Sequence, residues 1–266
     1  MFRNIKRSVR FLLSKEKELY YFGKYAAWEA AEKESEKYGA AYSSDNILER
    51  VSEATQKVRS GEGVYEQDGI VFYEENNNYE LIAALLLVYS RRKSLRVLDF
   101  GGALGSTYFR YRKLLEPCEC EWTIIEQKHY VEYGKSHVPE INFLYDVAEG
   151  ANGADVILLS SVLGYLDDTY AQFKRLLEQK VEYVIIDELA FSPDDVETVM
   201  LQHVPARIYS AVYPVRLLSL TGFKQFIENN GYEIVWEWDY RFGNIPVCEG
   251  MKVRDTVEKG FLLKLR

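Results

Sequence analysis

The stretch Arg96–Gly105, which reads RVLDFGGALG, decides how this chain is expected to fold. A short apolar run ends in an acid, Asp99, and three glycines follow closely: Gly101, Gly102 and Gly105. Glycine has no Cβ and adopts positive φ without strain, so such a turn lets main-chain atoms approach a ligand closely. In α/β proteins, ligands bind at the carboxyl ends of the parallel strands. The stretch therefore predicts a strand, a tight ligand-binding turn and then a helix.

The spacing of these glycines distinguishes between two adenosine-bearing ligands. The dinucleotide fingerprint is Gly-x-Gly-x-x-Gly, whereas this chain has Asp-x-Gly-Gly-x-x-Gly. The difference favours S-adenosylmethionine (SAM) over a dinucleotide.

Strand and helix patterns alternate from Tyr79 onward. Apolar runs bounded by turn residues predict strands at 95–100, 121–126, 141–145, 154–159 and 181–186, with a closing pair at 232–239 and 260–265. Helices are predicted at 79–89, 106–115, 131–136, 169–179 and 221–229. Strands that alternate with helices form a parallel sheet with right-handed crossovers, and a final pair without a helix between its strands adds an antiparallel strand. The prediction is an α/β fold with a Rossmann-like, seven-stranded sheet, mostly parallel, whose last strand is antiparallel.

The chain divides in the prediction into an N-terminal helical extension at residues 1–78 and a second domain at 79–266. Helical patterns cover 26–38 and 46–60, and a short hairpin is predicted within 64–73, around an Asp-Gly turn. We expect this extension to fold over the carboxyl edge of the sheet, as a lid or as a platform for a substrate.

Composition narrows the class of protein. The net charge of the 266 residues is −8, which argues against a nucleic-acid partner because phosphates are neutralised by a basic face. The three cysteines, Cys118, Cys120 and Cys248, make neither a disulfide framework nor a metal site, so a reducing cytoplasm is expected. Residues 2–13 combine an apolar face with basic side chains. They predict either a docked terminal helix or a peripheral contact with the inner membrane face.

Further blocks follow the glycine turn in order. They are Val97–Gly102, Trp122–Gln127, Leu158–Leu166, Val184–Asp187 and Gln202–Pro205. With this set, the chain resembles a class I SAM-dependent methyltransferase, and more closely a group of bacterial methyltransferases often associated with surface-polysaccharide gene clusters. The resemblance covers most of the chain. It implies SAM as the cofactor and, as the methyl acceptor, an oxygen of a sugar or glycan precursor, with nitrogen as the alternative.

Two acids are the main predicted cofactor contacts. Asp99 is expected to accept hydrogen bonds from the turn amides or, by resemblance, to hold the amino group of the methionine part. Glu126 ends the second strand, where a carboxylate can accept both ribose hydroxyls, and the adjacent Gln127 is a further predicted cofactor contact. The alternatives are a structural cap at Asp99 and a solvated acid at Glu126.

The next two strands end in weaker candidates. Asp146 follows the third strand and is expected to reach the adenine amino group, with a solvated loop acid as the alternative. Ser160 and Ser161 follow the fourth strand, where methyltransferases place residues near the adenosine and the methyl donor. The Asn-Pro-Pro-Tyr type of signature is absent there, which argues against an enzyme that methylates amino groups of DNA or glutamine.

Methyl transfer requires in-line approach of the acceptor, and a hydroxyl acceptor also requires a base. His203 is the leading candidate because an imidazole ordinarily titrates near neutral pH. Asp187, at the end of the fifth strand, is either the alternative base or a group that orients His203. Tyr209, Tyr213 and Phe191 are expected to wall the acceptor pocket, and aromatic faces also attract the sulfonium cation. The alternative for His203 is a packed or surface histidine, and for each tyrosine it is core packing.

Two other functions stay open on the sequence alone. A nicotinamide-dependent oxidoreductase would share the sheet and the acid after the second strand, although this chain lacks the dinucleotide fingerprint. A non-catalytic protein with a methyltransferase fold would use the same sheet to bind a partner in polysaccharide assembly.

Overall fold

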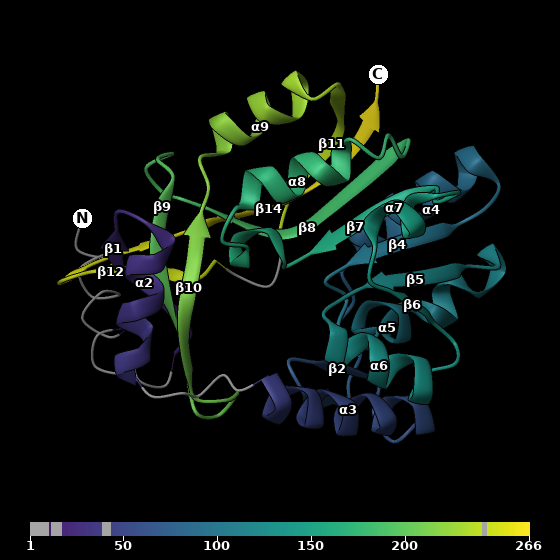
Figure 1. Cartoon of the computed structure of the whole chain (residues 1–266), viewed down its shortest axis with the longest axis horizontal. Coiled ribbons are helices and arrows are strands. Elements are labelled where there is room, and N and C mark those ends of the chain that lie inside the picture. The colour runs from purple at the N-terminus through teal and green to yellow at the C-terminus, as the bar shows by residue number, and fades with distance from the viewer. Residues whose placement is uncertain (1–10, 12–17, 39–43, 241–243) are drawn as a thin grey trace.

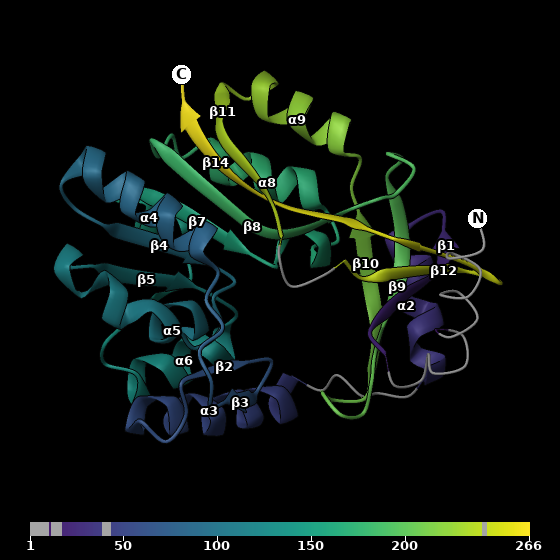
Figure 2. The same cartoon turned by 180° about the vertical axis from the view of Figure 1, so that it is seen from behind.

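Two β-sheets lie side by side in the computed structural model of the chain (Figures 1 and 2). The structure describes residues 11, 18–38, 44–240 and 244–266. Within these residues, one sheet has seven strands, the second has five, and a separate hairpin has two.

The seven-stranded sheet confirms the predicted fold class. Its order is β11-β14-β8-β7-β4-β5-β6, and the pairs from β8 to β6 are parallel, whereas β14 runs antiparallel to both of its neighbours. The strands are β4 (Arg96–Phe100), β5 (Glu121–Ile125), β6 (Asn142–Leu144), β7 (Val156–Ser160), β8 (Tyr183–Phe191), β11 (Tyr232–Asp239) and β14 (Val257–Leu265).

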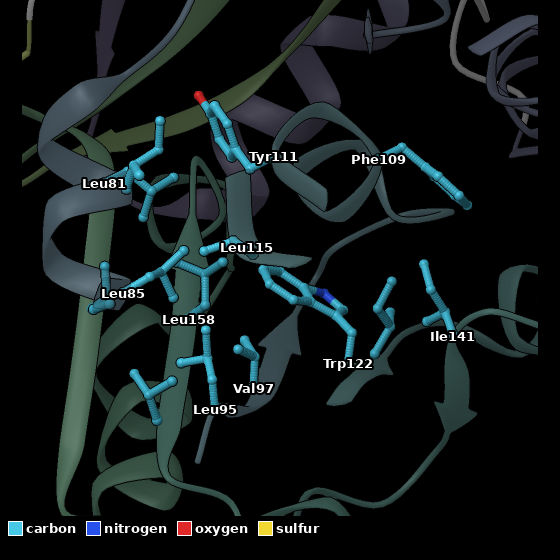
Figure 3. Packing of buried hydrophobic residues seen from close by; sticks show 14 of the residues in the cluster. Leu81, Leu85, Leu95, Val97, Phe109, Tyr111, Leu115, Trp122, Ile141 and Leu158 are labelled. Atoms are coloured by element: carbon cyan, nitrogen blue, oxygen red, sulfur yellow. The ribbon is translucent and has the colours of Figure 1, made fainter. Parts of the chain in front are cut away.

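Helices cover both faces of this sheet. They are α4 (Tyr79–Arg92), α5 (Ser106–Leu115), α6 (Lys128–His137), α7 (Val147–Ala151), α8 (Thr169–Leu177) and α9 (Leu220–Asn229). Successive strand residues point to opposite faces, so Val97 joins a core with α4, α5 and α6, and Leu98 joins a core with α8 and α9. Figure 3 shows the first of these cores, in which the Trp122 indole lies among aliphatic side chains.

The five-stranded sheet has no counterpart in the sequence prediction. Its order is β10-β9-β1-β12-β13, with β1 and β12 parallel and the other pairs antiparallel. The strands are β1 (Tyr20–Tyr25), β9 (Thr198–Val204), β10 (Ala211–Leu217), β12 (Pro246–Glu249) and β13 (Lys252–Asp255). Helix α2 (Trp28–Ser35) packs on this sheet through Ala31, which is fully buried with Val199 and Leu201.

The N-terminal residues contribute to both halves of the molecule. Strand β1 lies inside the second sheet, whereas α3 (Ser44–Ser60) packs into the core of the seven-stranded sheet. The predicted hairpin exists as β2 (Tyr65–Gln67) and β3 (Ile70–Phe72), which pair antiparallel. The extension therefore contains three strands besides its helices, and residue 78 does not separate the two sheets.

The predicted membrane contact at residues 2–13 lies outside the described residues, except for Phe11, whose ring meets that of Tyr20 edge-on. Among the helices that the structure describes, none is both long and apolar enough to cross a membrane.

Candidate functional site

The glycine turn joins β4 to α5, as the sequence predicts. Gly101 and Gly105 have φ values of 77° and 96°, a region that favours glycine. The Gly101 amide donates to the carbonyl of Ile125 on the neighbouring strand at 2.9 Å, and the Gly105 amide donates to that of Gly102 at 2.9 Å. The turn is thereby held against β5, and its backbone lies at the carboxyl edge of the sheet.

Asp99 lies directly beneath this turn. The residue is 1% exposed and accepts a hydrogen bond from the indole nitrogen of Trp122 at 3.0 Å. A Cβ on Gly102 would stand only 2.4 Å from Oδ2 of Asp99, so the backbone has to be bare at that position. Burial, together with the negative charge of Glu126, raises the pKa of Asp99 to about 7, although the Trp122 hydrogen bond opposes the rise.

Glu126 connects the second strand to the turn. Its carboxylate accepts from the amide of Ala103 at 3.3 Å and from the amide of Gln127 at 2.7 Å. Burial raises the pKa of Glu126, and these two hydrogen bonds oppose the rise. The exposed Gln127 precedes α6 and gives no side-chain cap. Asp99 and Glu126, the two main predicted cofactor acids, therefore flank the glycine turn.

The weaker candidates lie at the same edge. Asp146 is exposed, and its carboxylate accepts from the amide of Glu149 at 3.0 Å, which caps α7. Ser160 is the register partner of Asp187 across β7 and β8. The exposed Ser161 has φ 53°, and its amide donates to the carbonyl of Asp187 at 3.0 Å.

The structure does not bring Asp187 and His203 together. Both carboxylate oxygens of Asp187 accept from the side-chain amide of Asn78 at 3.0 Å, and burial raises the pKa of Asp187 to about 6. The Nδ1 atom of His203 lies 3.0 Å from the carbonyl oxygen of Glu18, and its ring stacks on Tyr20. Asp187 therefore has a different partner from the one that the sequence predicts, and it does not orient His203.

The orientation of His203 follows from its place in β9. Neighbouring residues of a strand point to opposite faces of the sheet, and Gln202 points to the face that carries Tyr165 and Tyr213. His203 therefore faces away from these tyrosines.

The predicted acceptor wall divides into two groups. Phe191 is fully buried between Phe223 and Phe261, so it packs the core and does not face an acceptor. Tyr209 and Tyr213, in contrast, belong to a chain of polar side chains, and their hydroxyl oxygens lie 3.3 Å apart.

We call this chain the hydroxyl network; it consists of Tyr21, Tyr165, Gln202, Tyr213 and Tyr209. The Tyr165 hydroxyl donates to Oε1 of Gln202 at 2.7 Å, and Nε2 of Gln202 donates to the Tyr213 hydroxyl at 3.2 Å. The hydroxyl of Tyr21 is hydrogen-bonded to that of Tyr165. Burial raises the pKa of the Tyr21 and Tyr165 phenols, so these two groups stay neutral, and the network presents hydroxyl and amide groups.

Glu188 is a residue that sequence reasoning missed. It follows Asp187 at a β-bulge, where these two residues oppose the single Gly260 of β14. Its φ is 55°, in the left-handed region, and its carboxylate is hydrogen-bonded to the Tyr240 hydroxyl. Burial, followed by the charges of Asp187 and its other acidic neighbours, raises the pKa of Glu188 to about 8. The available sequence signal was a pair of consecutive acids inside an apolar strand.

The β2–β3 hairpin adds a second missed acid beside the turn. Glu66 is 3% exposed and accepts from the hydroxyl of Ser106, the first residue of α5, and from the amide of Gly69 at 3.2 Å. Burial raises the pKa of Glu66 to about 7, against the Ser106 hydrogen bond. Asp68, at the tip of this hairpin, lies close enough to Glu188 for its charge to raise the pKa of that residue. The hairpin therefore lies near both features, with Glu66 beside the start of α5 after the glycine turn and Asp68 near Glu188 of the bulge.

Comparisons with known proteins show a likeness in fold. No protein-family model and no curated protein matches the chain. A solved SAM-dependent methyltransferase from Methanosarcina mazei is 10% identical, covers 71% of this chain and 99% of its own, and has a TM-score of 0.50. The glycopeptide N-methyltransferase MtfA, complexed with SAM, is 13% identical over 67% of this chain and 91% of its own, with a TM-score of 0.47. The N-terminal domain of EvdMO1, with S-adenosylhomocysteine bound, is 14% identical over 86% of this chain and 99% of its own, at 0.45. The likeness to the Methanosarcina protein, together with the strand order, shows that this chain has the Rossmann-like methyltransferase fold.

Proposed function

We propose that this chain is a SAM-dependent methyltransferase that methylates a hydroxyl of a sugar or glycan precursor. The observation that carries the proposal is the bare glycine turn between two carboxylates, Asp99 beneath it and Glu126 beside it. The sequence resemblance to methyltransferases of surface-polysaccharide gene clusters supports the choice of acceptor.

The charge of the site fits SAM better than a dinucleotide. Among the described residues, the basic group that acts on these two carboxyl groups is His129, whose charge opposes the rise in the pKa of Glu126. Two carboxylates beside a single histidine attract a ligand with an ammonium and a sulfonium group, and they repel a pyrophosphate. The same charges disfavour the nicotinamide-dependent oxidoreductase.

Each residue at the edge then has a role. Asp99 would hold the ammonium group, Glu126 would accept the two ribose hydroxyls, and the missing Cβ of Gly102 makes room for the Asp99 carboxylate beneath the turn. Asp146 would reach the adenine amino group from the end of β6. When bound, SAM supplies a methyl group that is activated by the positive charge on sulfur. The chain itself has to orient the acceptor in line with the carbon–sulfur bond.

The acceptor side of the proposal rests on the hydroxyl network. Neutral phenols and one carboxamide suit a ligand with several hydroxyl groups, because each can donate or accept a hydrogen bond. Asp187, which is ionised above its pKa of about 6, would repel an acceptor with a phosphate or carboxylate close to the reacting hydroxyl, and Glu188 would do so in its carboxylate form.

Isothermal titration calorimetry with SAM and S-adenosylhomocysteine tests the cofactor assignment. Both ligands are expected to bind the full chain, and Glu126→Gln is expected to weaken binding by about tenfold or more, the loss of one charge-assisted hydrogen bond. Glu121→Gln is the matched control, because Glu121 is exposed at the opposite end of the same strand. Absence of binding to the folded wild-type protein would refute the proposal. Binding without transfer to any glycan would favour the non-catalytic alternative.

A further inference from the structure

We infer that Glu188 accepts the proton of the acceptor hydroxyl, and that the acceptor sugar lies between the β8 bulge and the hydroxyl network. This inference rests on the proposed function and adds to it the base and the acceptor position.

The first argument is the backbone at Glu188. A left-handed conformation is unfavourable for a residue with a Cβ, and such conformations are concentrated at functional sites. A β-bulge re-aims the side chain of the bulged residue and is over-represented beside active sites. In β8 the bulge contains Asp187, the register partner of Ser160 at the predicted cofactor edge, together with Glu188. Glu188 therefore lies beside the place where the methyl donor is expected.

The second argument is the set of groups around Glu188. The groups that act on Glu188 come from four elements: Asp187 on its own strand, Glu258 on β14, Asp68 on the β2–β3 hairpin and Tyr240 after β11. The charge of Glu188 in turn raises the pKa of Tyr21 on β1 and of Tyr165 after β7. The cation nearby is Arg110 of α5, which acts on Asp187 and Tyr240. The negative neighbours favour the protonated acid, so burial and charge together make Glu188 a stronger base than an ordinary carboxylate.

The third argument is the position of the hydroxyl network relative to Glu188. Tyr165 lies in the segment that follows β7, and its phenol is raised in pKa by burial first and then by the charges of Tyr21 and Glu188. From Tyr165 the network continues through Gln202 to Tyr213 in the second sheet. A sugar between these groups would meet Glu188 on one side and hydroxyl or amide groups on the other. His203, the base predicted from sequence, faces away from this space.

In the chemical step, SAM donates the methyl group and its sulfur is the leaving group. The acceptor oxygen forms a bond to the methyl carbon of SAM, the carbon–sulfur bond breaks, and its electron pair remains on sulfur. The hydroxyl proton moves to the carboxylate of Glu188, which releases it to solvent after the product leaves. Only the carboxylate form can act, so the rate is expected to rise with pH.

The experiment measures transfer from SAM labelled with tritium in its methyl group. The probes are the methyl glycosides of glucose, mannose, galactose and rhamnose, tested with the full chain. With SAM saturating at every pH, at least one is expected to be methylated, with a rate that rises about tenfold per pH unit below about pH 8 and then levels off. Glu188→Gln is expected to lower the rate by about 10²–10⁴-fold and to abolish this rise. Glu233→Gln, an exposed acid on β11, should keep the wild-type rate and profile.

Two binding measurements separate this inference from the proposed function. Calorimetry should give Glu188→Gln the same affinity for SAM as the wild type. Saturation-transfer NMR in the presence of S-adenosylhomocysteine should show that the variant still binds the glycoside. If Glu188→Gln does not fold, Glu188→Asp serves instead, because it keeps a carboxylate and should keep the pH-dependent rise at a lower rate.

Two results would overturn the inference while SAM binding and methyl transfer stay intact. They are an unchanged rate in Glu188→Gln and a pH-dependent rise that persists in that variant. Failure of the wild type to bind SAM, or failure of all four glycosides to accept a methyl group, would instead refute the proposed function.

Discussion

The affinity for SAM is expected to depend on pH through Asp99. Burial, and then the charge of Glu126, raise the pKa of this carboxyl group to about 7 in the ligand-free protein. An ammonium group is held by the carboxylate form, so below that pKa binding has to displace a proton. The affinity should therefore be constant above about pH 7 and should weaken by about tenfold for each unit below it.

Two substitutions should move the midpoint of this dependence in opposite directions. Trp122→Phe removes the 3.0 Å hydrogen bond that stabilises the carboxylate. A hydrogen bond to a charged group contributes about 1.5–3 kcal/mol, and one pKa unit corresponds to about 1.4 kcal/mol, so the midpoint should rise by about 1–2 units. Glu126→Gln removes the neighbouring negative charge, so the midpoint should fall.

Calorimetric titration with SAM from about pH 6 to about pH 8 gives the dissociation constants, and two buffers with different ionisation enthalpies give the number of protons released. Glu121→Gln should leave the midpoint unchanged, and circular dichroism at each pH should establish that the protein stays folded. The reasoning would be refuted by an affinity that does not vary over this range, or by Trp122→Phe and Glu126→Gln shifting the midpoint in the same direction.

Three further substitutions test the packing and the charges that hold the fold. Gly102→Ala places a Cβ 2.4 Å from Oδ2 of Asp99. Overpacking costs about 1–3 kcal/mol of folding stability, which urea unfolding should show, and displacement of the Asp99 carboxylate should also weaken SAM binding in calorimetry. Asn78→Ala removes both the cap of α4 and the donor to the buried Asp187. Urea unfolding should show a loss of about 2–4 kcal/mol, and a loss below about 0.5 kcal/mol would contradict this role. Burial raises the pKa of Asp155, but the hydrogen bonds from its arginine partners outweigh it and lower the pKa to about 2. A lowered pKa stabilises the fold at pH values above the pKa of the unfolded state. The difference in melting temperature between the wild type and Asp155→Asn should therefore disappear as the pH falls from about 4 to about 2.

Much of the seven-stranded sheet was predictable because its signals are local. The strand at 95–100 and the helix at 106–115 are marked by apolar runs and by glycines between them. The same stretch located Asp99 and the turn of the candidate site. Glu126 was found because a carboxyl end of the neighbouring strand lies at the same edge, a consequence of parallel pairing.

The acceptor side was not predictable in the same way. Strand β1 pairs with β9 and β12, both far away in the sequence, and none of the three has a strong alternating pattern of its own. The orientation of His203 depends on this pairing, because the sheet decides which face of β9 meets the tyrosines. Asp187 and Asn78 are 109 residues apart, and nothing near either residue indicates their contact.

The amino-acid sequence by itself determined the order of strands and helices in the seven-stranded sheet, the glycine turn and the two acids beside it, because each depends on the conformational preferences of a short segment. Only the tertiary structure decided that a second sheet exists, that Glu188 lies at a bulge of β8, and that a network of hydroxyl groups lies near it. These features arise from pairing between distant segments, whose register is set by the burial of whole faces and not by the residues of any one strand.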